Sequence, residues 1–345
     1  MKVVVVRYGE IALKSGPVRS KFEKILLSNI RRMIRSFGHA YKKSTRIIVE
    51  SEFPWKVCKV ISKIPGVVSC SPAVRVRSVL PEIVQNATKI AKRTVKKGET
   101  FAVRTSREGK HEFTSMDVNR IVGESILRSL PGSKVDLSNP DREIFIDIRE
   151  DETYIFTEKI SGVGGLPVGS EGKAICIFDG SGRDVKAAFL MMKRGCVIQI
   201  LSEASNVHRA KSLLVHHPHL TVFILPESFT KSIKQTPPRL RTIVKKRALV
   251  KIADLLSVRT GSVCLVLPDG LEFVRKFGLE GIRFVDEASS NSLILRPLLG
   301  EDLLKAEPKP SSKIFQIQKK RVLELEREIL KDLDGIVNSL VRRKL

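Results

Sequence analysis

The chain has 345 residues, enough for two or three domains that each bury a core. Lys and Arg number 62 against 37 Asp and Glu, and the resulting net charge of +25 favours a polyanionic partner. No apolar run approaches the ~18 residues of a membrane-spanning helix, which excludes a membrane protein. The apolar stretch after Met1 suits a buried strand better than a signal peptide, so we expect a cytoplasmic protein.

The five cysteines are odd in number and scattered, and they form no CxxC pair. This spacing argues against a disulfide framework and against a structural zinc site. We therefore expect a reducing compartment and no metal.

The first segment, residues 1–57, is predicted to be a small α+β unit. A capping box formed by Ser20 and Glu23 is expected to begin an amphipathic helix that Gly38 ends, followed by a strand over Thr45–Glu50. The second segment, residues 58–166, is also predicted as α+β.

The elements expected in the second segment alternate between strands and a helix. They are a strand over Phe101–Thr105, a helix over Met116–Leu130, and strands over Ile144–Ile148 and Tyr154–Phe156. A glycine-rich stretch at 161–172 then marks a domain boundary.

The third segment, residues 167–306, is predicted as an α/β domain with an open parallel sheet. It starts with a βαβ unit, and further strands are expected at 221–225 and 262–267. A Pro-rich linker at 307–312 precedes a long amphipathic helix from Val322 to Leu340. Its apolar stripe would be buried by docking on the core or by self-association, the latter giving a homodimer.

A loop of Gly and polar residues joins the first strand of this domain to its helix. Such a loop at a helix N-terminus can hold phosphate on its backbone N–H groups, although a tight turn that needs glycines explains it equally well. Its residues are Asp179, Gly180, Ser181, Gly182, Arg183 and Asp184.

Two groups of basic residues are candidates for RNA contacts. The stretch from Ser228 to Ala253 has eight basic residues and no acidic one, which indicates a polyanion contact or a solubilising surface. The other group follows the strand at 101–105 and consists of Arg104, Arg107, Lys110 and Arg120.

Four motifs, in order over residues 1–305, resemble the tRNA 4-thiouridine synthetase (tRNA sulfurtransferase) family. The first is Arg7-Tyr8-Gly9-Glu10-Ile11-Ala12-Leu13-Lys14 with Arg19, Phe22 and Glu23 after it. The others are Gly162-Val163-Gly164-Gly165-Leu166-Pro167-Val168-Gly169, Leu190-Met191-Met192-Lys193-Arg194-Gly195 and Leu295-Arg296-Pro297-Leu298-Leu299-Gly300.

The resemblance implies an N-terminal ferredoxin-like domain (1–57), a THUMP domain that binds the tRNA acceptor end (58–166) and a Rossmann-like PP-loop domain (167–306). Members of the family activate a tRNA uridine with ATP and displace AMP with sulfur from a cysteine persulfide. We expect the RNA-binding side chains to be Lys14, Arg19, Arg104, Arg107, Lys110, Arg120, Lys245 and Lys246.

This chain departs from the family where that chemistry takes place. The family loop Ser-Gly-Gly-x-Asp-Ser falls on residues 179–184, where only Gly180 is retained and Asp179 would repel phosphate. The family's Thr-Gly-Glu-Ser-Leu falls on Leu267-Pro268-Asp269-Gly270-Leu271, and no cysteine stands near Arg241 to Arg247.

The sequence therefore predicts a tRNA-binding RNA-recognition or adaptor protein with a degenerate PP-loop domain, which works with a tRNA-modifying enzyme or a sulfur carrier. We assign it no catalytic residue, no metal and no cofactor. The alternative is an active, ATP-dependent tRNA sulfurtransferase with a divergent site, and only that alternative requires ATP.

Overall fold

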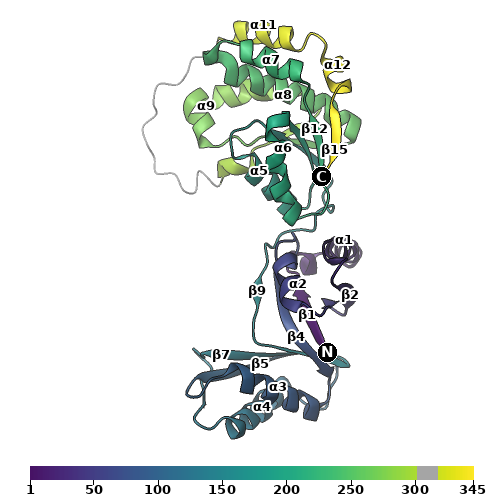
Figure 1. Ribbon diagram of the computed structural model, residues 1–345, viewed down its shortest axis with the longest axis vertical. Helices are drawn as coiled ribbons and strands as arrows, with labels where there is room; N and C mark the ends of the chain where they lie inside the picture. The colour runs from purple at the N-terminus through teal and green to yellow at the C-terminus, as the bar shows by residue number, and fades with distance from the viewer. Residues whose placement is uncertain (301–317) are drawn as a thin grey trace. The chain divides into compact units, whose positions relative to one another are not determined.

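The computed structural model describes residues 1–300 and 318–345, which form two compact units, Met1–Gly165 and Leu166–Leu345. Each unit is built on its own β-sheet (Figure 1). The expected linker at 307–312 lies outside the described residues. Among the described helices, none combines the length and apolar character needed to cross a membrane.

The first unit is built on one nine-stranded sheet with the order β2-β3-β1-β4-β8-β7-β5-β6, in which β9 also pairs with β4. The long strand β4 pairs with β1 on one side and with β8 on the other, which joins both predicted segments in one sheet. Helix α2 runs across residue 57, where we expected one domain to end. That domain limit stays a prediction. The strands are β1 Lys2–Arg7, β2 His39–Lys43, β3 Arg46–Glu50, β4 Ser69–Arg77, β5 Thr100–Glu108, β6 Lys134–Val135, β7 Arg142–Arg149, β8 Glu152–Phe156 and β9 Ile160–Ser161.

Four α-helices and a 3₁₀ turn accompany this sheet: η1 Glu10–Leu13, α1 Gly16–Ile34, α2 Pro54–Ile61, α3 Leu80–Thr94 and α4 Ser115–Ser129. The expected capping box is wrong, because α1 begins at Gly16 and Ser20 lies inside the helix. Glu23 is instead buried, where it accepts hydrogen bonds from Tyr8 at 2.6 Å and Arg19 at 2.9 Å.

The two faces of strand β7 bury different groups. Ile144, Ile146 and Ile148 pack in one apolar cluster with α3 and α4, whereas Phe145 packs with side chains of β1, β3, β4 and β8. Successive side chains of a strand point to opposite faces, so the sheet has a helix-covered face and a second face. Phe145 is only half-buried and leaves part of its ring open on that second face.

The second unit has a six-stranded sheet with the order β14-β13-β10-β11-β12-β15. All its pairs are parallel except β12 with β15, which confirms the predicted α/β class. Its strands are β10 Lys173–Phe178, β11 Val197–Ser202, β12 Thr221–Ile224, β13 Cys264–Val266, β14 Leu293–Leu295 and β15 Val341–Lys344.

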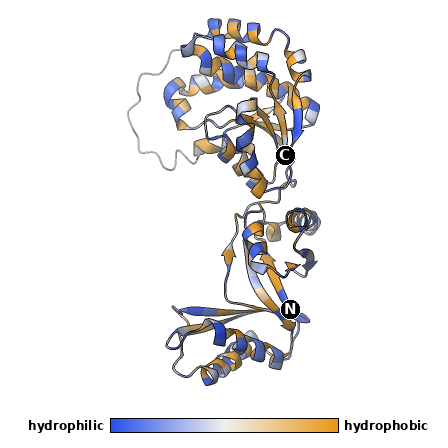
Figure 2. Cartoon of the chain, in the orientation of Figure 1, coloured by the Kyte–Doolittle hydropathy of each residue, from blue (hydrophilic) through white to orange (hydrophobic). Residues whose placement is uncertain are grey.

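Both faces of this parallel sheet are covered, so β10 reads as a continuous apolar run. One cluster packs Ile175 and Leu201 with α7, α8, α9 and α11, and the other packs Cys176 and Ile200 with α5. Figure 2 shows the central strands as strongly hydrophobic. The helices and turns are α5 Asp184–Lys193, η2 Ala204–Asn206, α6 Val207–Ala210, η3 Lys211–Val215, α7 Glu227–Gln235, α8 Pro238–Thr260, α9 Leu271–Asp286, α11 Lys319–Ile329 and α12 Leu333–Asn338.

The expectation of one long C-terminal helix is wrong. The segment forms α11, α12 and then strand β15, which pairs with β12 at the edge of the sheet (Figure 1). Val322 and Leu325 are buried against the core, so the apolar stripe docks on its own chain rather than on a second copy. Leu330 and Asp332 lie in the break between the two helices.

A buried ion pair fastens the docked segment. Glu326 of α11 is 1% exposed and accepts from Arg247 Nε of α8 at 2.5 Å, and it also pairs with Lys251. Arg247 donates as well to the carbonyl of Phe284 in α9. One carboxylate thus joins the C-terminal segment to the central helix of the unit.

Replacing Glu326→Gln is expected to destabilise the second unit by about 3–5 kcal/mol, because Arg247 would remain buried without its anionic partner. Glu324→Gln on the same helix is the control, because Glu324 is exposed and pairs with Arg321, and it should cost less than about 0.5 kcal/mol. The only tryptophan, Trp55, lies in the first unit, so the measurement is hydrogen exchange of α8 and α11 peptides. Equal protection in the two variants would contradict the anchoring role of Glu326.

Candidate functional site

The loop from Asp179 to Arg183 joins β10 to α5 at the carboxyl edge of the parallel sheet. This edge is where open α/β sheets bind their ligands. Gly180 and Gly182 adopt left-handed backbone angles, with φ of 87° and 88°. A side chain at either position would be strained, which accounts for the two glycines in a loop of otherwise polar residues.

The backbone donors of this loop are used by its own carboxylates. Ser181 N–H donates to Asp179 Oδ1 at 2.9 Å, and Val185 N–H donates to Asp184 Oδ1 at 2.9 Å. Gly180 N–H also bonds to Asp184, whose Oδ1 pairs with Arg209 at 2.9 Å. Three N–H groups of the loop and the helix start, those of Gly180, Ser181 and Val185, thus have carboxylate acceptors, and Arg183 N–H donates to the Ser181 hydroxyl at 3.4 Å.

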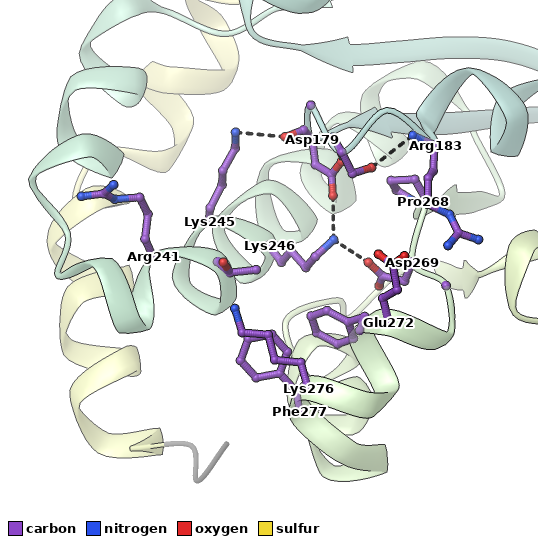
Figure 3. A pocket seen from close by; sticks show the side chains of 15 residues that line it. Asp179, Arg183, Arg241, Lys245, Lys246, Pro268, Asp269, Glu272, Lys276 and Phe277 are labelled. Atoms are coloured by element: carbon purple, nitrogen blue, oxygen red, sulfur yellow. Dashed lines mark hydrogen bonds and ion pairs between the residues drawn. The ribbon is translucent and has the colours of Figure 1, made fainter. Parts of the chain in front are cut away.

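A lysine from the middle of α8 lies between two carboxylates at this edge. Lys246 Nζ is 2.6 Å from Asp179 Oδ2 and also pairs with Asp269, which follows β13 (Figure 3). Asp269 in turn accepts from Arg296 Nε at 3.0 Å, and Arg296 pairs with Asp286 at 2.6 Å. We call Asp179, Lys246, Asp269 and Arg296 the ion network.

The opposite charges in the ion network offset the cost of burying each of them. Burial alone would lower the pKa of Lys246, but the carboxylates of Asp269 and Asp179 outweigh it and raise the pKa above its ordinary value. Burial would raise the pKa of Asp179, yet Lys246 and the Ser181 bonds hold that pKa below its usual range. For Asp184, burial outweighs Arg209 and raises the pKa of the carboxyl.

A cavity of about 410 Å³ opens beside the loop and the ion network. Arg183, Arg241, Lys245 and Lys276 contribute positive charge to its lining, and the rings of Phe273 and Phe277 contribute apolar surface (Figure 3). Lys245 also pairs with Glu203 at 2.7 Å and donates to the Asp179 carbonyl at 3.2 Å. Asp179, Asp269 and Glu272 add carboxylates to the same lining, so the cavity combines both signs of charge with apolar rings.

The structure places the predicted RNA-binding residues of the first unit in separate positions. Arg104 on β5 and Arg120 on α4 line one cavity of about 550 Å³. Arg107 is exposed and donates to the carbonyl of Gly109, and Lys110 is exposed in the following turn.

The remaining candidates also differ in accessibility. Lys14 is exposed after the 3₁₀ turn, and Arg19 is committed to Glu23 at 2.9 Å. In the second unit, Lys245 lines the cavity, whereas Lys246 is buried in the ion network and is not available as a surface RNA contact.

Sequence reasoning missed several side chains that the structure brings to this edge of the sheet. They are Arg296, which bonds to Asp269, and Lys276, Phe273 and Phe277, which line the cavity. Helical periodicity could have predicted the burial of Lys246 and Arg247, because both lie three or four positions from Ile243 and Val250, which are fully buried. The pairing of Lys246 with two distant carboxylates had no signal in the sequence.

The cysteines and the metal-ligating side chains were the remaining candidates for chemistry. All five cysteines are free and buried, as expected of structural residues, and burial raises the pKa of Cys264 to about 11. Over residues 1–300 and 318–345, no group of three metal-ligating side chains comes together.

Replacing Lys246→Met is expected to destabilise the second unit by about 3–5 kcal/mol, because two buried carboxylates would lose their shared cation. The loss should be largest between pH 4 and 10. Asp179, with its lowered pKa, contributes stability above about pH 4 and loses it on acidification, whereas Lys246, with its raised pKa, contributes below about pH 10 and loses it as the pH rises further.

The control for this prediction is Lys231→Met on α7, because Lys231 is exposed and pairs only with Glu227 four residues away. It should change stability by less than about 0.5 kcal/mol at any pH. Urea denaturation followed by circular dichroism at pH 3, 7 and 11 measures both variants. A loss that stays constant across this range would contradict the electrostatic account.

Comparison with known proteins places the chain among relatives along most of its length. Family models match residues 3–71 (ThiI ferredoxin-like domain), 77–158 (THUMP domain) and 169–307 (Thiamine biosynthesis protein, ThiI). The fold is similar to that of a 4-thiouridine synthetase in complex with RNA and ATP, with a TM-score of 0.82, 21% identity and full coverage of both chains. PH1313 from Pyrococcus horikoshii has a TM-score of 0.69 and 29% identity, with 96% of this chain and 100% of that chain covered.

Two relatives are similar over nearly the whole sequence. The probable tRNA sulfurtransferase of Methanocaldococcus jannaschii is 35% identical over 324 residues, which cover 87% of this chain and 84% of the relative. That of Saccharolobus solfataricus is 34% identical and covers 88% and 83%. At this identity and coverage, the chain belongs to the ThiI family, whose curated members are named tRNA sulfurtransferases.

Proposed function

We propose that this family member binds tRNA through its first unit and acts in tRNA modification as an RNA-recognition or adaptor module, in the cytoplasm, where tRNA is modified. The net charge of +25 supports a polyanionic partner, and relatives named tRNA sulfurtransferases support tRNA as that partner. The module would deliver tRNA to a modifying enzyme or a sulfur carrier.

The cavity between β5 and α4 supports recognition of unpaired nucleotides. Its walls combine apolar side chains with Arg104 and Arg120. Two polar atoms that line it, Thr105 Oγ1 and Asn119 Oδ1, are buried without a hydrogen-bond partner in the part of the chain that the structure describes. Unstacked bases offer complementary edges to such groups, and arginines bind their phosphates.

The observation that supports an inactive nucleotide loop is the internal use of its donors. Asp179 and Asp184 occupy the N–H groups of Ser181, Gly180 and Val185, where the family loop would bind pyrophosphate. An incoming phosphate would have to displace buried carboxylates of its own charge sign, one of which is held by Lys246. We therefore propose that the loop serves as scaffold and that ATP is not its ligand.

A second candidate function is ATP-dependent sulfur transfer to a tRNA uridine. The relatives' names favour it, and so does the cavity of about 410 Å³, whose cations and phenylalanine rings suit a nucleotide. The residues fit ATP poorly at the loop, where Asp179 stands, and the stretch from Arg241 to Arg247 offers no cysteine to carry sulfur.

Binding of unfractionated tRNA should be strongly salt-dependent and should weaken more than about tenfold in Arg120→Glu, because charge reversal removes a phosphate contact and adds repulsion. Arg128→Glu on the same helix is the control, since Arg128 is exposed but does not line the cavity. Filter binding across a salt series measures both variants. Equal losses of affinity in the two variants would show that the RNA binds outside this cavity. Binding of duplex DNA as tight as that of tRNA would contradict the RNA role.

The chain incubated with tRNA, ATP and a persulfide donor should yield no 4-thiouridine, and calorimetry should detect no ATP binding in the millimolar range. Restoring the family loop in residues 179–184 should not create activity, because no cysteine is present to carry sulfur near Arg241. Mass spectrometry of the digested tRNA is the measurement. Detection of 4-thiouridine with the unaltered chain would establish the second candidate function.

A further inference from the structure

Two cations lie over a pair of stacked rings on the second face of the first unit's sheet. The rings of Phe145 and Phe156 stack with centroids 5.2 Å apart. Arg7 lies over Phe156 with its guanidinium carbon 4.6 Å from the centroid, and Lys159 Nζ lies 3.7 Å from the centroid of Phe145. The four residues come from β1, β7, β8 and the turn before β9.

Strand pairing brings the two cations to the same part of the sheet. Arg7 Nη1 donates to Ser71 of β4 at 3.0 Å. In the antiparallel pair of β4 with β9, Cys70 is opposite Ile160, so the register places Lys159 opposite Ser71. Arg7 and Lys159 therefore flank one residue, Ser71.

These two cations differ from their neighbours in having no carboxylate partner. Arg46 and Arg149 both pair with Asp147, at 3.3 and 2.7 Å, and Arg104 pairs with Glu143 at 2.9 Å. Across the described residues, neither Arg7 nor Lys159 forms an ion pair, and Arg7 Nη2 is buried without any hydrogen-bond partner. The carboxylate of Asp147 acts on both cations through its charge, but it is bonded to Arg46 and Arg149 instead.

The surroundings lower the pKa of both Lys159 and Arg7. Burial and the charge of Arg7 lower the pKa of Lys159, against the opposing effect of Glu143 and Asp147. Burial is also the largest cause that lowers the pKa of Arg7, with Asp147 opposing it and Arg46 adding to it. An anion bound beside these groups would relieve the repulsion between them.

We propose that Lys159, supported by the charge of Arg7 behind it, binds a phosphodiester of the RNA that the first unit recognises. Lys159 is exposed and makes the contact, whereas Arg7 is half-buried and acts through its field. This inference rests on the proposed RNA-binding function.

The position of Arg104 favours an RNA chain over a small free anion. Arg104 lies opposite Phe145 in the pairing of β5 with β7, Lys159 lies over the ring of Phe145, and Arg104 also lines the cavity between β5 and α4. A strand whose unpaired bases enter that cavity would carry its next phosphates toward Lys159. A free phosphate would use only one of the two sites.

The test compares three variants of the full chain in binding to unfractionated tRNA across a salt series. Lys159→Met keeps an aliphatic side chain over Phe145 but removes the charge, and it should weaken binding about fivefold near 0.15 M salt and reduce the salt slope by about one. Lys159→Arg keeps the charge and should keep both the affinity and the slope. Lys89→Met removes a charge from α3, at an exposed position that does not line the cavity, and should change neither.

The outcomes separate this inference from the proposed function. If the unaltered chain binds no tRNA, the proposed function fails, and the inference fails with it. If the unaltered chain binds tRNA but Lys159→Met has the affinity and slope of Lys89→Met, the inference alone is overturned. Binding of inorganic phosphate at Lys159 with no change in the tRNA slope would also overturn it. The fluorescence of Trp55, which lies in the same unit, checks that each variant is folded.

Discussion

One ammonium group between two carboxylates organises the carboxyl edge of the second unit's sheet. Lys246 joins α8 to the loop after β10 and to the loop after β13, and Arg296 extends the same ion network to the segment after β14. Each of these charges would be costly to bury alone, and together they are satisfied. The loop conformation, the cavity wall and the position of α8 all depend on this arrangement.

The ion network also makes the two units differ in how their charged groups could meet an anionic ligand. In the second unit, carboxylates accept from three N–H groups of the loop and neutralise the central lysine, at the edge where open α/β sheets bind their ligands. In the first unit, Arg7 and Lys159 have no ion-pair partner among the described residues, and the cavity beside Arg104 keeps unpartnered polar atoms. Cations that could meet an anionic ligand therefore lie on both units, at Arg7, Lys159 and Arg104 in the first and along the cavity in the second.

Sequence reasoning was most successful where a pattern is local. The parallel sheet and the helix after residue 184 follow from apolar runs and turn residues, and the structure confirms them. It failed at Ser20, where a local capping signal competed with Pro17 at the true helix start, and at Glu23, whose partners Tyr8 and Lys42 come from other elements. It failed again in the C-terminal segment, where the helical spacing of apolar residues continues past Ile329 although the helix itself ends there.

The sequence alone determined the family, the class of each sheet and the positively charged character of the protein, because motifs, strand and helix periodicity and net charge are properties of the chain itself. It also drew attention to the loop at 179–184, whose departure from the family motif stays a prediction. Only the tertiary structure decided which charges remain available, because ion pairs such as Lys246 with Asp179 join residues 67 positions apart, and burial determines whether a cation meets solvent or a carboxylate. For the same reason, Lys246 belongs to the core of the second unit while Lys159 remains exposed on the first.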